Sequence, residues 1–383
     1  MAKRRSRTPA RNESPFKGRV TRLRALMREV GVSHLLVTDP NDVAYLTGFL
    51  GGDSFLLVPP SGKPTIISDG RYDVELDPQR PMCKIFLRTG SIYKAVADVA
   101  GAEHDARNLY RLGVQGEHVT LQGRDAIKKA FKKARLPESK LYATEGLVGD
   151  LRERKDASEI ALIRAAAKIQ EEALEATLPQ IQIGMTEFEV CAVLEYEMKV
   201  RGSTAPGFTT IVAAQANGAL PHYRPGTTRV KRGEPLLIDW GAIVDGYHSD
   251  MCRTFNFGRW SAQMREIYEI VREAQRLAIN ALGPGVPTRE VDRAARDHIT
   301  KHGYGKEYNH GLGHGLGLQV HEEPRLSHMT ADDVLEPGHV VTIEPGIYLP
   351  GIGGVRIEDD YAVTERGRQR LTTLPTDIEW CTL

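Results

Sequence analysis

The sequence has 383 residues, 41% of them hydrophobic and 26% charged, and its 51 Lys and Arg nearly balance its 50 Asp and Glu. A chain of this length exceeds an ordinary single domain, so we expect two domains. The balanced charge and the lack of an apolar stretch near the roughly 20 residues of a membrane span predict no nucleic-acid partner and no membrane partner. Four scattered cysteines without CxxC spacing indicate no disulfide framework and fit a cytoplasmic protein.

The first part of the chain is predicted to be a basic tail followed by a mixed α/β domain. Residues 1–15 are basic and polar, and no apolar segment follows them as in a secretory signal, so we expect a disordered tail. Over residues 16–150 the pattern predicts a helix with Val20, Leu23, Met27 and Val30 on one face, a strand at 34–38, a hairpin of 54–58 and 65–68, and strands in KIFL and RLGV. We therefore expect one α/β domain over residues 16–150.

A charged segment, LRERKDASE, marks the predicted boundary, and residues 151–383 form the second expected domain. A weak internal repeat runs through this domain. GMTEFEV at 184–190 matches GVPTREV at 285–291, and RGEPLLIDWG at 232–241 matches PGHVVTIEPG at 337–346. Each copy predicts a helix, a glycine break, a second helix and a β-ribbon, which implies a duplicated architecture.

Acidic residues stand at corresponding places in the two predicted ribbons. Asp239 ends the apolar strand LLID and Asp250 lies beyond a turn at Gly246, whereas Glu344 follows VVTI and Glu358 follows a glycine-rich turn. Burying an unpaired carboxylate at the end of such a strand costs several kcal/mol. Clustered metal ions would remove that cost, so the pattern predicts a metal site.

The segment between the ribbons, HGLGHGLGLQVHEEP, interleaves His310, His314 and His321 with glycines. Glycines let the backbone approach closely while the imidazoles project. One imidazole among four carboxylates suits manganese, cobalt or zinc better than calcium or an iron-sulfur cluster. Two ions that share carboxylates can activate one water and polarise a carbonyl group, so the set predicts a hydrolase.

With these motifs the sequence resembles the pita-bread metallopeptidases, which include aminopeptidase P, prolidase and methionine aminopeptidase. The similar stretches, in family order, are IDWGAIVDGYHSD, HGLGHGLGLQVHEEP, TIEPGIY and GGVRIED. NDVAYLTGF at 41–49 and SDGRYDVEL at 68–76 look like the creatinase-type N-terminal domain of the proline-directed members. The resemblance implies a creatinase-like α/β domain at 16–150, a pita-bread α/β domain with a pseudo-twofold repeat at 151–383, and a homodimer.

The resemblance also implies the roles of the metal ligands. Asp239 is expected to chelate one ion, Asp250 and Glu358 to bridge two ions, and His314 and Glu344 to complete the other ion. Glu344 is further expected to transfer the proton during hydrolysis. The implied cofactor is a pair of divalent ions, with Mn²⁺ preferred and Co²⁺ or Zn²⁺ as alternatives.

The remaining site residues follow from the same resemblance. His310 and His321 are expected to line the substrate site and stabilise the developing charge, His222 to lie near the substrate, and Arg356 to brace the carboxylate ligands. The alternatives are a surface loop for His222 and a structural role for His310. Asp359 and Asp360 are interpreted as solvated neighbours of Glu358. Cys252 stands where the family usually has a threonine, which puts the threonine's hydrogen bond in doubt because a thiol is a weak donor and acceptor.

The reaction implied for the whole chain is cleavage of a peptide bond before proline, in short proline-containing peptides. Such a bond needs a dedicated enzyme because its amide lacks an N–H and the ring fixes φ. An Xaa-Pro aminopeptidase is the preferred interpretation and an Xaa-Pro dipeptidase the alternative. Arg325, if it pairs with the free carboxylate of a dipeptide, would favour the dipeptidase; otherwise it is a solvated loop residue. A metal-free creatinase-like amidinohydrolase and an inactive pita-bread binding module are the rival hypotheses.

Overall fold

The computed structural model describes residues 15–103, 111–136, 141–330 and 333–383. The chain divides into two compact units, Met1–Leu151 and Arg152–Leu383. The predicted tail at 1–15 lies outside the described residues except for Pro15, which begins the first helix. Among the described helices, none is both long and apolar enough to cross a membrane.

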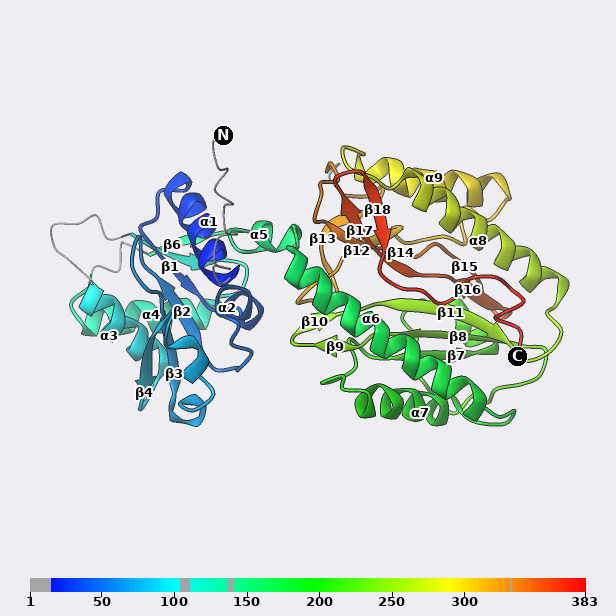
Figure 1. The fold of residues 1–383 in the computed structure, drawn as a ribbon, viewed down its shortest axis with the longest axis horizontal. Helices are drawn as coiled ribbons and strands as arrows, with labels where there is room; N and C mark the ends of the chain where they lie inside the picture. The colour runs from blue at the N-terminus through cyan, green and yellow to red at the C-terminus, as the bar shows by residue number, and fades with distance from the viewer. Residues whose placement is uncertain (1–14, 104–110, 137–140, 331–332) are drawn as a thin grey trace, which may run out of the picture. The chain divides into compact units, whose positions relative to one another are not determined.

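The first unit is built on one mixed sheet (Figure 1). Its helices are α1 (Pro15–Glu29), α2 (Pro40–Thr47), α3 (Ile92–Glu103) and α4 (Leu121–Lys133), and its strands are β1 (His34–Val37), β2 (Phe55–Val58), β3 (Thr65–Asp69), β4 (Lys84–Arg88), β5 (Leu112–Gln115) and β6 (Leu141–Thr144). The strand order is β4-β3-β2-β1-β5-β6, with β2 antiparallel to β1 and β3 and the other pairs parallel. The predicted hairpin is therefore confirmed as β2 and β3.

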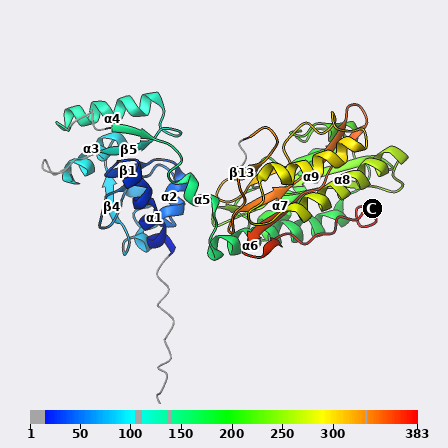
Figure 2. The same cartoon turned by 90° about the horizontal axis from the view of Figure 1, so that it is seen from above.

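Alternate residues of the central strands supply the two faces of this sheet. Leu36, Leu57 and Ile67 point to the face that α3 and α4 cover. Helices α1 and α2 lie on the opposite side of the sheet (Figure 2). Val20, Leu23 and Met27 of α1 are buried as predicted, but Val30 is 50% exposed because the helix ends at Glu29.

The second unit combines two helix pairs with antiparallel strands. Its helices are α6 (Ala157–Thr177), α7 (Glu187–Val200), α8 (Ala262–Ala281) and α9 (Thr288–Lys301), and the short α5 (Gly149–Glu153) spans the division between the units. Its strands are β7 (Ile211–Ala214), β8 (Pro235–Trp240), β9 (Ile243–Val244), β10 (Tyr247–His248), β11 (Met251–Asn256), β12 (Gly313–Gly315), β13 (Glu322–Leu326), β14 (Val340–Ile343), β15 (Gly346–Leu349), β16 (Gly353–Arg356), β17 (Asp359–Thr364) and β18 (Gly367–Arg370).

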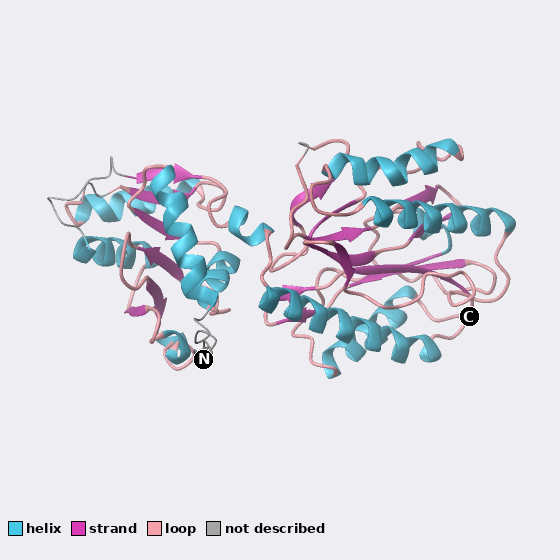
Figure 3. Ribbon diagram, turned by 45° about the horizontal axis from the view of Figure 1, so that its top comes forward, coloured by secondary structure: helices cyan, strands magenta, loops and turns pink. Residues whose placement is uncertain are grey.

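The strands of this unit pair in the orders β11-β8-β7 and β13-β12-β14-β17-β18, with β9-β10 and β15-β16 as separate ribbons. A bridge between Cys252 and Glu358 joins the two larger sheets. Figure 3 shows the strands in the middle of the unit and the helix pairs outside them. Apolar residues of all four long helices and of the strands form one core between these layers.

The predicted repeat is visible in the order of the elements. Helix α6 packs with α7, and α8 packs with α9. The matched segments 184–190 and 285–291 lead into α7 and α9, and the matched ribbons contain β8 and β14. The duplicated helix-helix-ribbon architecture is therefore confirmed.

A buried group of charges ties the start of this unit to β13. Arg152 Nη2 donates to Glu322 Oε1 at 2.5 Å, and Lys155 Nζ lies 2.9 Å from Glu322 Oε2. Burial by itself raises the pKa of Glu322, but Lys155 and Arg152 outweigh it and lower the pKa to about 2. The carboxylate therefore stays ionised and paired at neutral pH.

We predict that Glu322→Gln lowers the free energy of unfolding by about 3 kcal/mol at pH 7, since the folded pKa is depressed below its unfolded value. The stabilisation from the ionised Glu322 is complete at pH values above the unfolded pKa and is lost as the pH falls through about 2. At pH 3 the difference in unfolding free energy between wild type and Glu322→Gln should therefore be less than half of its value at pH 7. Denaturant titrations at both pH values measure it. Glu323→Gln, at the exposed neighbouring position, is the control and should change stability by less than about 0.5 kcal/mol. Equal losses in the two variants would contradict the buried pairing.

Candidate metal centre and substrate cavity

One cavity of about 710 Å³ in the second unit is lined by every site residue that the sequence analysis selected. These residues come from segments far apart in the sequence: Asp239, Asp250, His314, Glu344 and Glu358 as predicted metal ligands, and His222, His310, His321, Arg325 and Arg356 as predicted catalytic or substrate-binding residues. The structure thus brings them all to one place. Their individual roles stay predictions.

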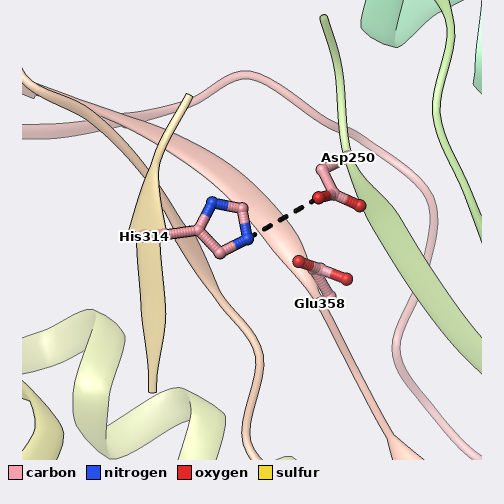
Figure 4. A group of neighbouring side chains, drawn as sticks. All are labelled: Asp250, His314 and Glu358. Carbon is pink, nitrogen blue, oxygen red and sulfur yellow. Dashed lines mark ion pairs between the residues drawn. The ribbon is translucent and has the colours of Figure 1, made fainter. Parts of the chain in front are cut away.

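The acidic residues reach the cavity from strand ends. Asp239 belongs to β8, Asp250 directly precedes β11, Glu344 directly follows β14, and Glu358 lies between β16 and β17. One side-chain ligand atom each from Asp250, His314 and Glu358 lies within 4.8 Å of the others, and Figure 4 shows the three side chains converging. This spacing would allow one cation to contact all three side chains.

Hydrogen bonding indicates which nitrogen of His314 faces the acids. His314 Nδ1 lies 3.0 Å from its neighbour's carbonyl, Gly315 O, and so carries the proton. His314 Nε2 then presents a lone pair, 3.4 Å from Glu344 Oε1 and 3.8 Å from Asp250 Oδ2. Burial, followed by His321, lowers the pKa of His314 to about 3, so the imidazole is neutral and available as a ligand at pH 7.

Glycines on both sides of His314 permit the close strand packing. A Cβ atom on Gly313 would lie 2.1 Å from Thr342 O, and one on Gly315 would lie 2.1 Å from Glu323 O. Both distances are far inside van der Waals contact. The role predicted for these glycines, close backbone approach with a projecting histidine, is therefore confirmed.

Some oxygen atoms of the buried acids lack hydrogen-bond partners, and divalent cations could bind them. Asp239 Oδ1 and Asp250 Oδ1 are buried and have no hydrogen-bond partner within the described part of the chain. Burial raises the pKa values of Asp250 and Glu358 well above their usual range, and neighbouring carboxylates raise them further. Burial also raises the pKa of Glu344 to about 8. Oxygen atoms without partners, gathered around a neutral imidazole, are a donor set that divalent metals satisfy.

Arg356 connects the metal centre to His310. Its Nη2 donates to Asp239 Oδ2, and its Nη1 donates to the Tyr348 hydroxyl at 2.8 Å. His310 Nδ1 lies 2.7 Å from Gly311 O, so its Nε2 accepts the Tyr348 hydroxyl hydrogen at 2.9 Å. Burial, followed by Arg356, lowers the pKa of His310 to about 3, which keeps this ring neutral. The predicted bracing contact of Arg356 with a ligand carboxylate is present, and Tyr348 extends it.

The loop before β12 is held by an ion pair on α9. Asp292 is fully buried and forms a two-bond pair with Arg296, both N···O distances being 2.8 Å. Arg296 also donates to Tyr308 O and His310 O, and Asp292 Oδ1 accepts the Leu312 amide at 3.1 Å. This pair was not predicted from the sequence, although an Asp and an Arg four residues apart on a helix are a recognisable signal.

The interpretation of Asp359 and Asp360 as solvated neighbours is wrong, because both are 0% exposed. Asp359 pairs with Arg253, whose Nη1 also donates to the Glu358 carbonyl at 2.6 Å. Asp360 Oδ2 accepts the Asp250 amide at 3.1 Å. The acids after Glu358 therefore support the backbone of two predicted ligands.

Cys252 lies in β11, paired with Asp239 across the sheet and bridged to Glu358. Burial raises the pKa of its thiol well above the usual range, so it stays protonated. The thiol has no hydrogen-bond partner among the residues that the structure describes. The hydrogen bond that the sequence put in doubt is thus not formed by Cys252 among the described residues.

The other predicted substrate residues lie toward the open part of the cavity. His222 and His321 are exposed, and the His321 ring stands edge-on to His314 with centroids 4.3 Å apart. Arg325 of β13 has 37% of its side chain exposed. Buried carboxylates with unsatisfied oxygens, together with exposed histidines and an arginine in one cavity, are the groups that a metal-dependent hydrolase needs.

Similarity to known protein families identifies the class of hydrolase. Residues 161–365 match metallopeptidase family M24, and residues 19–154 match the Creatinase/Prolidase N-terminal domain. The chain belongs to metallopeptidase family M24, and the predicted pita-bread fold, creatinase-type N-terminal domain and metallopeptidase class are confirmed.

Several relatives are similar over nearly the whole chain. An Xaa-Pro dipeptidase of Pyrococcus furiosus is 36% identical over 365 residues, which cover 95% of this chain and 100% of the relative. The solved Xaa-Pro dipeptidase from Bacillus anthracis matches with a TM-score of 0.88 at 36% identity, covering 95% of this chain and 99% of that one. The solved X-Pro aminopeptidase from Thermotoga maritima matches with a TM-score of 0.82 at 33% identity, covering 91% and 98%.

The raised pKa values of the acids predict how pH and metal act together. The unfolded acids ionise before the folded ones, so the stability of the metal-free protein should fall as the pH rises from about 5 to 8. Metal binding needs the ionised acids, so the gain in melting temperature on adding Mn²⁺ should be larger at pH 8 than at pH 6. Mn²⁺ at about 100 times its dissociation constant should contribute about 3 kcal/mol.

Asp250→Ala should lose most of this gain and most of the bound metal, measured by elemental analysis. Asp245→Ala, in the turn before β10, is the control and should bind metal as wild type does. Full activity in Asp250→Ala would show that Asp250 is no ligand.

Proposed function

We propose that the protein is an Xaa-Pro dipeptidase that cleaves the bond before a C-terminal proline in dipeptides. Dipeptidases of that description match the chain over almost its full length. An Xaa-Pro aminopeptidase was the preferred interpretation of the sequence, and the relatives favour its alternative, the Xaa-Pro dipeptidase. The similarity to an X-Pro aminopeptidase keeps that activity as the second candidate. In this proposal residues 16–150 form the creatinase-type domain and residues 151–383 the catalytic domain.

The position of Arg325 is the observation that favours a dipeptide as the substrate. Its guanidinium lines the same cavity as the predicted ligands and lies close enough to His321 and His314 to lower their pKa values, after the larger effect of burial. Its ion pair with Glu323 is long, 3.8 Å between Nε and Oε1. A dipeptide carries its free carboxylate on the residue directly after its single scissile bond. A guanidinium beside the proposed catalytic residues, with only a weak partner of its own, can form an ion pair with that carboxylate.

The acids and His314 would hold two divalent ions, with Mn²⁺ as the proposed metal. When bound, such ions polarise the scissile carbonyl and lower the pKa of water. Glu344 is the proposed proton carrier, because a carboxylate that lines the cavity beside the predicted ligands can accept a proton from the attacking water and pass it to the proline nitrogen. His321 and His222, at the open side, would donate to the carbonyl oxygen and orient the peptide. The homodimer stays a prediction from the resemblance.

We predict that wild type cleaves Ala-Pro faster than Ala-Pro-Ala, and that it spares Ala-Ala and Ala-Ala-Ala. Arg325→Ala should lower kcat/KM for Ala-Pro about 10- to 100-fold and for Ala-Pro-Ala much less, because only the dipeptide places its carboxylate at this position. Arg224→Ala, at the other exposed arginine of the cavity, is the comparison. If Arg224→Ala alone discriminates against the dipeptide, the carboxylate role belongs to Arg224. Equal cleavage of peptides without proline would contradict the proline-directed function.

His321 is predicted to stabilise the transition state without binding metal. His321→Ala should lower kcat about 100-fold or more while leaving metal content nearly unchanged. His302→Ala, at the exposed histidine that follows α9, serves as the control and should keep wild-type rates. A parallel loss of metal and rate in His321→Ala would instead make His321 a ligand.

A further inference from the structure

Glu187, the first residue of α7, is a fully buried carboxylate that the proposed chemistry does not use. A carboxylate removed from water must be compensated by hydrogen-bond donors or charges. Four donors surround it: Ala214 N at 2.7 Å and Asn217 Nδ2 at 2.9 Å on Oε1, and Tyr223 OH and Gly226 N, both at 2.9 Å, on Oε2. Both carboxylate oxygens are therefore committed.

All four donors belong to one stretch of chain, residues 214–228, which begins at the end of β7 and carries His222. The backbone at the start of α7 holds the same stretch, because Glu187 N donates to Thr228 O at 3.0 Å and Phe188 N to Gly226 O at 3.2 Å. Asn217 Nδ2 also reaches Thr228 Oγ1 at 2.9 Å, which ties the two ends of the stretch together. The first turn of α7 thus gathers the whole segment around Glu187.

His222 depends on this segment for its position. The His222 side chain is exposed and lines the cavity, and its ring has no hydrogen-bond partner in the part of the chain that the structure describes. Its neighbour Pro221 receives a long contact, 3.4 Å, from Arg356 Nη2. An imidazole without a partner of its own lies where its backbone places it, so whatever orders residues 214–228 also places the ring.

We propose that Glu187 is the positioning residue of His222, acting through residues 214–228. The proposal rests on the proposed function, in which His222 orients the peptide. A simpler explanation is that Glu187 only stabilises the N-terminus of α7, as acids in a first turn do. Glu189 separates these explanations, since it lies in the same turn and closes a capping box with Thr186, yet accepts no hydrogen bond from residues 214–228.

The test compares Glu187→Gln with the matched control Glu189→Gln, each alone and combined with His222→Ala. In Glu187→Gln an NH₂ group faces donors that need an acceptor, so we expect kcat/KM for Ala-Pro to fall about 10- to 100-fold. Glu189→Gln should stay within about 2-fold of wild type, because glutamine still closes a capping box. Glu187→Gln should cause no further loss in the His222→Ala background, since misplacing an absent imidazole has no effect. Metal content should be unchanged.

Hydrogen exchange supplies a readout that does not depend on activity. Amides of residues 214–228 should exchange faster in Glu187→Gln and remain protected in Glu189→Gln. The proposal would be overturned if the losses of kcat/KM from Glu187→Gln and His222→Ala multiply in the double variant. It would also be overturned if Glu187→Gln keeps the wild-type kcat/KM and the wild-type protection of its amides from exchange. If Glu187→Gln does not fold, Asn217→Ala removes one donor from the same cluster and should give the same pattern at smaller size. If wild type cleaves no Ala-Pro, the proposed function fails, and the exchange result still decides whether Glu187 orders the segment.

Discussion

The second unit must compensate the repulsion among four carboxylates that the fold buries in one cavity. Asp239, Asp250, Glu344 and Glu358 come from strand ends in both halves of the repeat, and desolvation raises the pKa of each one. A protein that gathers them must either protonate them or supply cations. Membership of a metallopeptidase family agrees with the second outcome. The paired strands and the bridge between Cys252 and Glu358 hold the acids close enough together for cations to bind between them.

Charged side chains with a supporting role surround this centre, and helices of both pairs contribute them. On α9 the Asp292–Arg296 pair holds the carbonyl groups of Tyr308 and His310. On α7 Glu187 gathers the segment of His222. The two second helices of the repeat thus use different residues for a similar purpose. Loops have no regular backbone pairing of their own, so their polar groups need other hydrogen-bond partners. Helices α7 and α9 each supply such partners to a loop that carries a histidine.

The sequence alone determined the duplicated architecture and the membership of the predicted site. Glycine-flanked histidines and acids that follow apolar strands are local patterns, and their chemistry does not depend on distant partners. All the residues selected from these patterns line one cavity. The apolar periodicity of α1 and the β2–β3 hairpin were also readable, because burial of one helical face or one sheet face repeats with a fixed period.

Tertiary structure alone decided which charges are buried and what they contact. Asp359 looked solvated in the sequence, but Arg253, 106 residues away, pairs with it in the core. Nothing in the sequence distinguishes Glu187 from other acids at the start of a helix, and its hydrogen-bond partners lie 27 to 39 residues further along the chain. Tyr348 ends the TIEPGIY stretch, but no role for it could be predicted before Arg356 and His310 were seen on either side of its hydroxyl. Such roles depend on donors brought together by folding, and sequence spacing carries no information on how those donors are oriented.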